Sequence, residues 1–86
     1  MKLKQSFISH NTEEESLLVP TGSADFSGLV RGNKTFGVIV ELLKQETTEA
    51  EIVAAMEKRF DAPDGVIARD VSHAIARLRQ IGALDE

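Results

Sequence analysis

Short apolar stretches separated by polar turns fill the first third of the chain, a pattern that predicts strands. We expect strands over residues 7–10, 16–19 and 26–31. Pro20 should end the second strand or place it at an edge of the sheet, because proline has no amide hydrogen to donate. The first third of the chain therefore predicts three short strands.

The third of these strands, over 26–31, alternates between two faces. The residues divide into Phe26, Gly28 and Val30 on one face and Ser27, Leu29 and Arg31 on the other. Gly28 removes one side chain, which often marks a bulge or the close approach of another backbone.

Apolar residues at helical spacing follow, beginning after Asn33. Asn33 suits the N-cap of a first helix, because its side-chain oxygen can accept from a free amide of the first turn. A second helix should begin after Thr48, since Thr48 and Glu51 form a capping box. The stripes expected in the core are Phe36, Ile39, Val40 and Leu43 in the first helix, and Ile52, Met56 and Phe60 in the second.

A third helix is expected beyond the loop at 61–65. Pro63, within that loop, suits the first helical position, and Gly82 suits the stop. Its core face comprises Ile67, Val71, Ala74, Ile75, Leu78 and Ile81. We expect Leu84, beyond the stop, to dock on the core. The outline predicts one α+β domain over residues 1–86. It is winged helix-turn-helix-like, with a three-stranded antiparallel sheet followed by a three-helix bundle.

The composition is that of an ordinary small globular domain, with 42% apolar and 28% charged residues. The absence of cysteine excludes disulfides, thiol nucleophiles and cysteine-ligated metals, and it fits the reducing cytoplasm. Aromatic residues are four Phe alone, which argues against a platform for stacking nucleic-acid bases. No signal peptide and no apolar run of about 20 residues is found, so we expect no membrane partner.

The net charge of −4 is unevenly placed. Most of the chain is acidic and should repel DNA phosphates, so we expect no nucleic-acid partner. The third helix, however, has three arginines, Arg69, Arg77 and Arg79, against a single carboxylate at Asp70. A winged-helix DNA-binding protein that inserts this helix into the major groove therefore stays an alternative.

No constellation of catalytic or metal-binding residues is found in the sequence. His10 and His73 lie far apart, and neither has a neighbour at ligand spacing, whereas zinc needs three or four converging ligands. Glu49 and Glu51 suit the positive end of the second helix. We expect no enzyme activity and no cofactor, and a protein that binds a partner.

Several segments, in their order and spacing, resemble the PqqD family, named after protein D of pyrroloquinoline quinone biosynthesis. These segments are residues 26–33, 48–53, 59–62, 69–71 and 78–84. The resemblance implies a recognition element for ribosomally made peptides, which performs no chemistry itself. In that family the leader of a precursor peptide adds as a strand to the third strand, and the domain presents it to a separate modifying enzyme, often a radical S-adenosylmethionine enzyme.

The resemblance places the leader peptide in a groove between the third strand and the third helix. The expected peptide-binding residues are Phe26, Ser27, Gly28, Leu29, Val30 and Arg31 on the strand, and Val66, Asp70, His73 and Arg77 on the helix. Arg77 is the expected anchor for an acidic leader residue, because guanidinium pairs well with carboxylate. The alternatives are a solvated Arg77, a capping role or a local ion pair with an arginine for Asp70, and a strand paired internally on both sides. A free edge also favours pairing with a second copy, so a homodimer stays open.

Overall fold

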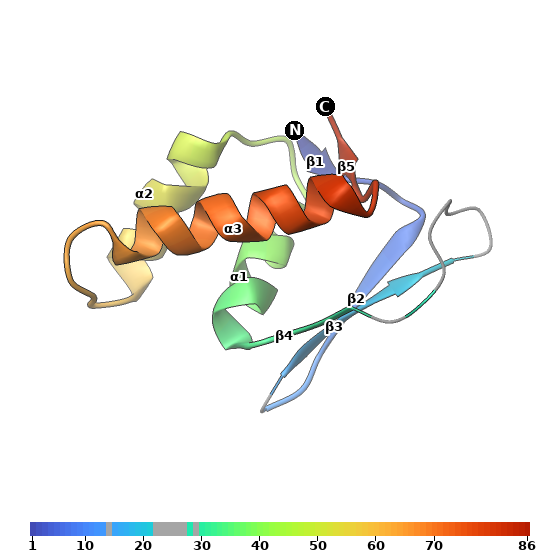
Figure 1. Ribbon diagram of the computed structural model, residues 1–86, viewed down its shortest axis with the longest axis horizontal. Coiled ribbons are helices and arrows are strands. Elements are labelled where there is room, and N and C mark those ends of the chain that lie inside the picture. Colours follow the sequence, from blue (N-terminus) through green and yellow to red (C-terminus); the bar gives the residue numbers. More distant parts are fainter. Residues whose placement is uncertain (14, 22–27, 29) are drawn as a thin grey trace.

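The structure is a computed structural model that describes residues 1–13, 15–21, 28 and 30–86. Its elements, in chain order, are β1 (Lys2–Leu3), β2 (Phe7–Asn11), β3 (Ser16–Pro20), β4 (Val30–Gly32), α1 (Lys34–Leu42), α2 (Glu49–Arg59), α3 (Val66–Gln80) and β5 (Leu84–Asp85). Figure 1 shows the three helices gathered together, with α3 running across the molecule and the sheet of β2, β3 and β4 to one side. The α+β, winged-helix-like outline expected from the sequence is confirmed.

Strands β2, β3 and β4 form one antiparallel sheet in that order. The register pairs Leu18 with Val30 and Ser16 with Gly32, all on one face. Leu18 and Val30 are buried there, which fixes the register, because a slip of one residue would turn both toward solvent. Since β4 is last in the order, it lies at an edge of the sheet formed by the described residues.

The predicted strands need small corrections at their ends. The first two are each one residue longer than expected. β3 ends at Pro20, and it is the central strand of its sheet rather than an edge strand. The third strand is observed over Val30–Gly32. Gly28 lies outside it with φ of 127°, a backbone conformation that favours glycine. The expected strand residues Phe26, Ser27 and Leu29 lie outside the described residues.

The helix starts at α1 and α2 are as predicted. Asn33 Oδ1 accepts a hydrogen bond from the amide of Phe36 at 2.9 Å, and Thr48 Oγ1 accepts one from the amide of Glu51 at 3.2 Å. Each bond satisfies an amide that the helix itself leaves free. The caps therefore fix where the chain turns from β4 into α1 and from the α1–α2 loop into α2.

The start of α3 differs from the prediction that Pro63 is its first residue. The helix begins at Val66, and its N-cap is Gly65 with φ of 84°. The Pro63 carbonyl accepts from the amide of Val66 at 3.2 Å. That turn and the left-handed glycine delay the helix beyond the proline. Gly82, with φ of 74°, ends α3 as predicted.

The helical stripes expected in the core are buried, with two exceptions. Phe60 is 37% exposed, because α2 ends at Arg59 and Phe60 has extended backbone angles that take it off the stripe. Ile81 is half-buried at the end of α3. The buried cluster lies where the three helices pack on one another and where α1 packs on the inner face of the sheet.

Leu84 docks on the core as expected, through a second sheet of two strands. β1 pairs antiparallel with β5, which sets Leu3 opposite Leu84. The amide of Leu3 donates to the Leu43 carbonyl at 2.7 Å, which ties this small sheet to the end of α1. The first and last residues consequently lie side by side in Figure 1.

Candidate functional site

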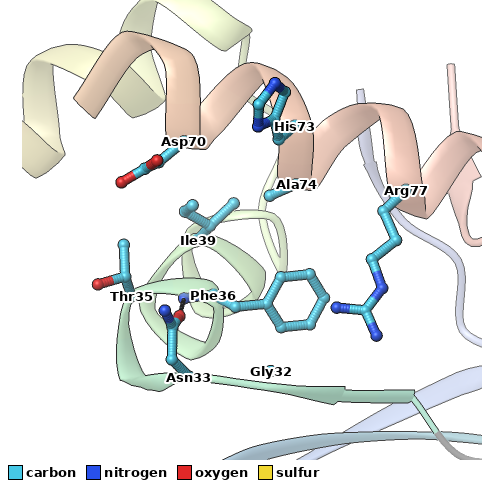
Figure 2. A pocket seen from close by; sticks show the side chains of 9 residues that line it. All are labelled: Gly32, Asn33, Thr35, Phe36, Ile39, Asp70, His73, Ala74 and Arg77. Atoms are coloured by element: carbon cyan, nitrogen blue, oxygen red, sulfur yellow. Dashed lines mark hydrogen bonds between the residues drawn. The ribbon is translucent and has the colours of Figure 1, made fainter. Parts of the chain in front are cut away.

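A cavity of about 250 Å³ opens between the end of β4, the first turns of α1 and one face of α3 (Figure 2). β4 and α1 are joined directly at Asn33, so the cap that starts α1 also sets the mouth of the cavity. The residues that line it are Gly32, Asn33, Thr35, Phe36, Ile39, Asp70, His73, Ala74 and Arg77.

The floor of this cavity is apolar, formed by Phe36, Ile39 and Ala74, which are each less than a tenth exposed. Gly32 makes room for the Phe36 ring: a Cβ at position 32 would lie 2.3 Å from Phe36 Cδ2. The absence of that side chain lets the ring lie against the backbone of β4. Strand, ring and helix thus form one continuous surface.

The α3 side of the cavity carries Asp70, His73 and Arg77, which are all exposed. Their spacing of three and four positions sets them on one face of the helix. The guanidinium carbon of Arg77 lies 5.3 Å from the centre of the Phe36 ring, within cation–π range. Figure 2 shows Asp70 at the end nearest Thr35 and Arg77 at the other end, beside the ring.

Asp70, His73 and Arg77 form no ion pair or side-chain hydrogen bond with any residue that the structure describes. Their polar groups are therefore available to a ligand in the cavity. The alternative of a local ion pair for Asp70 is not seen within the described part of the chain.

The free side of β4 adds backbone groups to the site. In an antiparallel sheet, alternate residues of an edge strand direct their N–H and C=O groups away from the neighbouring strand. Such an edge can accept a further strand. A chain added there would have its backbone on β4 and alternate side chains over the floor formed by Phe36, Ile39 and Ala74.

The structure brings together three of the predicted site residues, Asp70, His73 and Arg77. Val66 is half-buried and does not line the cavity, Val30 is buried in the core, and Arg31 and Gly28 are exposed. Phe26, Ser27 and Leu29 lie outside the described residues. All of these assignments remain predictions.

Sequence reasoning missed most of the cavity floor and mouth. The missed residues are Gly32, Asn33, Thr35, Phe36, Ile39 and Ala74, of which Asn33 was assigned as a cap and Phe36, Ile39 and Ala74 as core. A usable signal was present: a glycine four positions before an aromatic residue, at a strand-to-helix junction, leaves space for the ring to lie on the strand.

The structure gives no support at Arg79 of α3 for DNA binding, the alternative from the sequence. Arg77 stacks on Phe36. Arg79 donates to both carboxylate oxygens of Glu86, with a shortest contact of 2.7 Å from a terminal nitrogen. These hydrogen bonds, together with the charge attraction, raise the pKa of Arg79 and lower the pKa of Glu86. The Arg79 guanidinium is thus already engaged within the protein, whereas the Arg77 guanidinium keeps its N–H groups available beside the cavity.

Metal and membrane sites were also sought among the residues that the structure describes. No three or more His, Cys, Asp or Glu side chains gather there in a way that could hold a metal ion. No helix formed by those residues has the length and apolar character needed to cross a membrane.

Comparison with known proteins matches this chain to a protein family and to a solved structure of similar fold. The family model described as "Coenzyme PQQ synthesis protein D (PqqD)" matches residues 16–84, from the start of β3 to the start of β5. A solved structure titled "TbiB1 in Complex with the TbiA(beta) Leader Peptide" superposes with a TM-score of 0.73. It is 19% identical, and the match covers 99% of this chain and 100% of that chain. No match is found among curated proteins.

Proposed function

Because the chain belongs to the PqqD family, whose model spans most of its length, we propose that it binds the leader of a ribosomally made precursor peptide. The observation that carries this proposal is the free side of β4 beside an open cavity with an apolar floor. TbiB1, which shares the fold, was solved with a leader peptide, and this supports a peptide as the ligand.

The peptide would bind by strand addition to β4. Hydrogen bonds between the two backbones give affinity that depends little on sequence, and side-chain pockets give selectivity. The pocket here is the floor of Phe36, Ile39 and Ala74, which a side chain of the guest strand would cover. The expected contacts along the α3 side are Asp70, His73 and Arg77.

The domain itself would carry out no chemical step. It would hold the leader while a separate enzyme modifies another part of the precursor, and the family resemblance implies a radical S-adenosylmethionine enzyme as one class of partner. Division of labour of this kind needs only a binding surface on the small protein. Pairing with a second copy through the same edge stays a prediction.

Two measurements test strand addition. A peptide is first selected from a displayed library of random twelve-residue sequences. Added to ¹⁵N-labelled protein, it should shift the amide signals of β4 and of His73–Arg77 together. Shifts confined to the β2–β3 hairpin would contradict the proposed site.

N-methylation of the selected peptide, one residue at a time, then tests the hydrogen-bond pattern. A guest strand donates to β4 from alternate residues only. We expect binding to weaken at every second position and to change little at the positions between. Equal effects at all positions would show that the peptide does not bind as a strand.

A further inference from the structure

The cavity beside β4 has opposite charges at its two ends. We propose that it selects an extended peptide in which a basic residue is followed, two or four positions later, by an acidic residue. This inference rests on the proposed function and adds the chemical class and the direction of the ligand.

The charges come from two side chains. Of the nine lining residues, Asp70 and Arg77 are charged, and His73 between them is titratable. Both charged groups are exposed, and neither has an ion-pair partner among the described residues. The Phe36 ring holds the Arg77 guanidinium in place without neutralising it. An acidic guest side chain is thus favoured beside Arg77 and a basic one beside Asp70.

The spacing follows from the helix. Asp70 and Arg77 lie seven positions apart, a rise of about 10 Å along α3 at roughly 1.5 Å per residue. A strand rises about 3.3 Å per residue, and residues on one face of it are two or four apart. Guest residues two or four positions apart are separated by about 7 or 13 Å. Long charged side chains are flexible enough to bridge the difference from the distance of about 10 Å between Asp70 and Arg77 along α3. Two guest residues three positions apart would have their side chains on opposite faces of the strand.

The order follows from the direction of β4. In Figure 2, Gly32, the last residue of β4, lies below the Phe36 ring, and Asn33, the next residue, lies nearer the Asp70 end of the cavity. β4 therefore runs from the Arg77 end to the Asp70 end. Its sheet is antiparallel throughout, so the added strand is expected to run the opposite way. Such a guest meets Asp70 first and Arg77 second, which places its basic residue before its acidic one.

The test is a selection of displayed random twelve-residue peptides on three proteins. The first is the unchanged chain, and the second is Asp70→Arg with Arg77→Asp, which keeps the net charge and reverses the two ends. The third is the matched control Glu57→Lys with Lys58→Glu, an equal exchange at exposed positions of α2 outside the cavity. Circular dichroism and urea unfolding check that all three are folded.

On the unchanged chain and the control we expect enrichment of Lys or Arg followed at two or four positions by Asp or Glu. On the reversed variant we expect the acidic residue first. A peptide selected on the unchanged chain should bind the reversed variant roughly tenfold or more weakly, because two attractive pairs become repulsive.

The outcomes separate the two proposals. Peptides that shift the signals of β4 and α3 but show no charge order, or the same order on all three proteins, would overturn this inference and leave peptide binding intact. The acidic-first order on the unchanged chain would also overturn it. Failure of every selected peptide to shift those signals would overturn both proposals.

Discussion

The Arg77 guanidinium and the Phe36 ring join α3 to α1 above the end of β4, 5.3 Å from cation to ring centre. The two residues should contribute very differently to stability. Arg77→Gln removes an exposed cation–π contact, worth about 0.5–1 kcal/mol. Phe36→Ala empties a buried site and should cost about 3–5 kcal/mol. Urea unfolding measures both, with Arg69→Gln as the control for loss of an α3 arginine. Equal losses for the two substitutions would contradict this division.

Gly32→Ala should destabilise the fold by about 1–3 kcal/mol, because the new Cβ would overlap the Phe36 ring. Phe36 lines the cavity, so its displacement should weaken peptide binding as well. Arg31→Ala is the control for stability alone, since Arg31 is exposed on the same strand but is itself an expected peptide contact; Glu57→Ala, at an exposed position of α2 outside the cavity, is the control for binding. Unfolding midpoints and peptide titrations report the two effects. An unchanged midpoint for Gly32→Ala would show that Phe36 does not need this space.

Asn33→Ala and Thr48→Ala should each cost about 1 kcal/mol of unfolding free energy, because each removes the side chain that caps a helix. Asn33→Ser keeps a capping oxygen and should recover most of the loss. Asn33 lines the cavity and Thr48 does not, so Thr48→Ala should leave peptide affinity unchanged. Denaturation followed by circular dichroism, with a peptide titration alongside, checks both statements. A larger affinity change in Thr48→Ala than in Asn33→Ala would argue against the cavity as the binding site.

Gly82→Ala should destabilise the protein by about 1 kcal/mol, since residue 82 has φ of 74° and alanine is strained there. The amides of Gly82 and Ala83 donate to the carbonyls of Arg79 and Leu78, the hydrogen-bond pattern of a Schellman C-cap. Thermal unfolding measures the change. Gly82→Asn is the comparison variant, because asparagine tolerates this conformation better, and it should be the milder of the two. The reverse order would mean that the cap relaxes around alanine.

The Glu86 carboxyl should titrate below its ordinary value of 4.5, because hydrogen bonds from Arg79 stabilise its charged form. Its pKa is lowered in the folded state. Its contribution to stability is therefore complete above the unfolded pKa and is lost as the pH falls through the folded pKa. Carboxyl NMR titration of the unchanged chain and of Arg79→Gln measures the shift. The pKa should return toward 4.5 in the variant, and identical titrations would rule out the pair in solution.

Much of the helical part could be predicted from the sequence, because helical spacing and capping are local properties. Asn33 and Thr48 cap as expected, and the face of α3 that carries Asp70, His73 and Arg77 follows from the period alone. The helical spacing of apolar residues gives a wrong prediction of burial where it continues past the end of a helix. Phe60 fits the α2 stripe, yet the backbone has already turned extended there.

The remainder depends on contacts between distant segments, which no local pattern encodes. β1 and β5 have two residues each, too short for alternation to be recognised, and they pair only because the fold brings them together. The role of Gly32 likewise depends on where the Phe36 ring lies. The approximate positions of β2, β3 and β4 could be predicted from the sequence. The packing that shapes the cavity could not.

The pairing of β1 with β5 has a practical consequence for joining this domain to other proteins. The first and last residues lie side by side, across α3 from β4 in Figure 1. A loop of another protein could therefore be opened at one point and this domain spliced in, with both junctions only a short linker apart. An enzyme could equally be fused at either end, with β4 and the proposed peptide site left on the opposite side of α3.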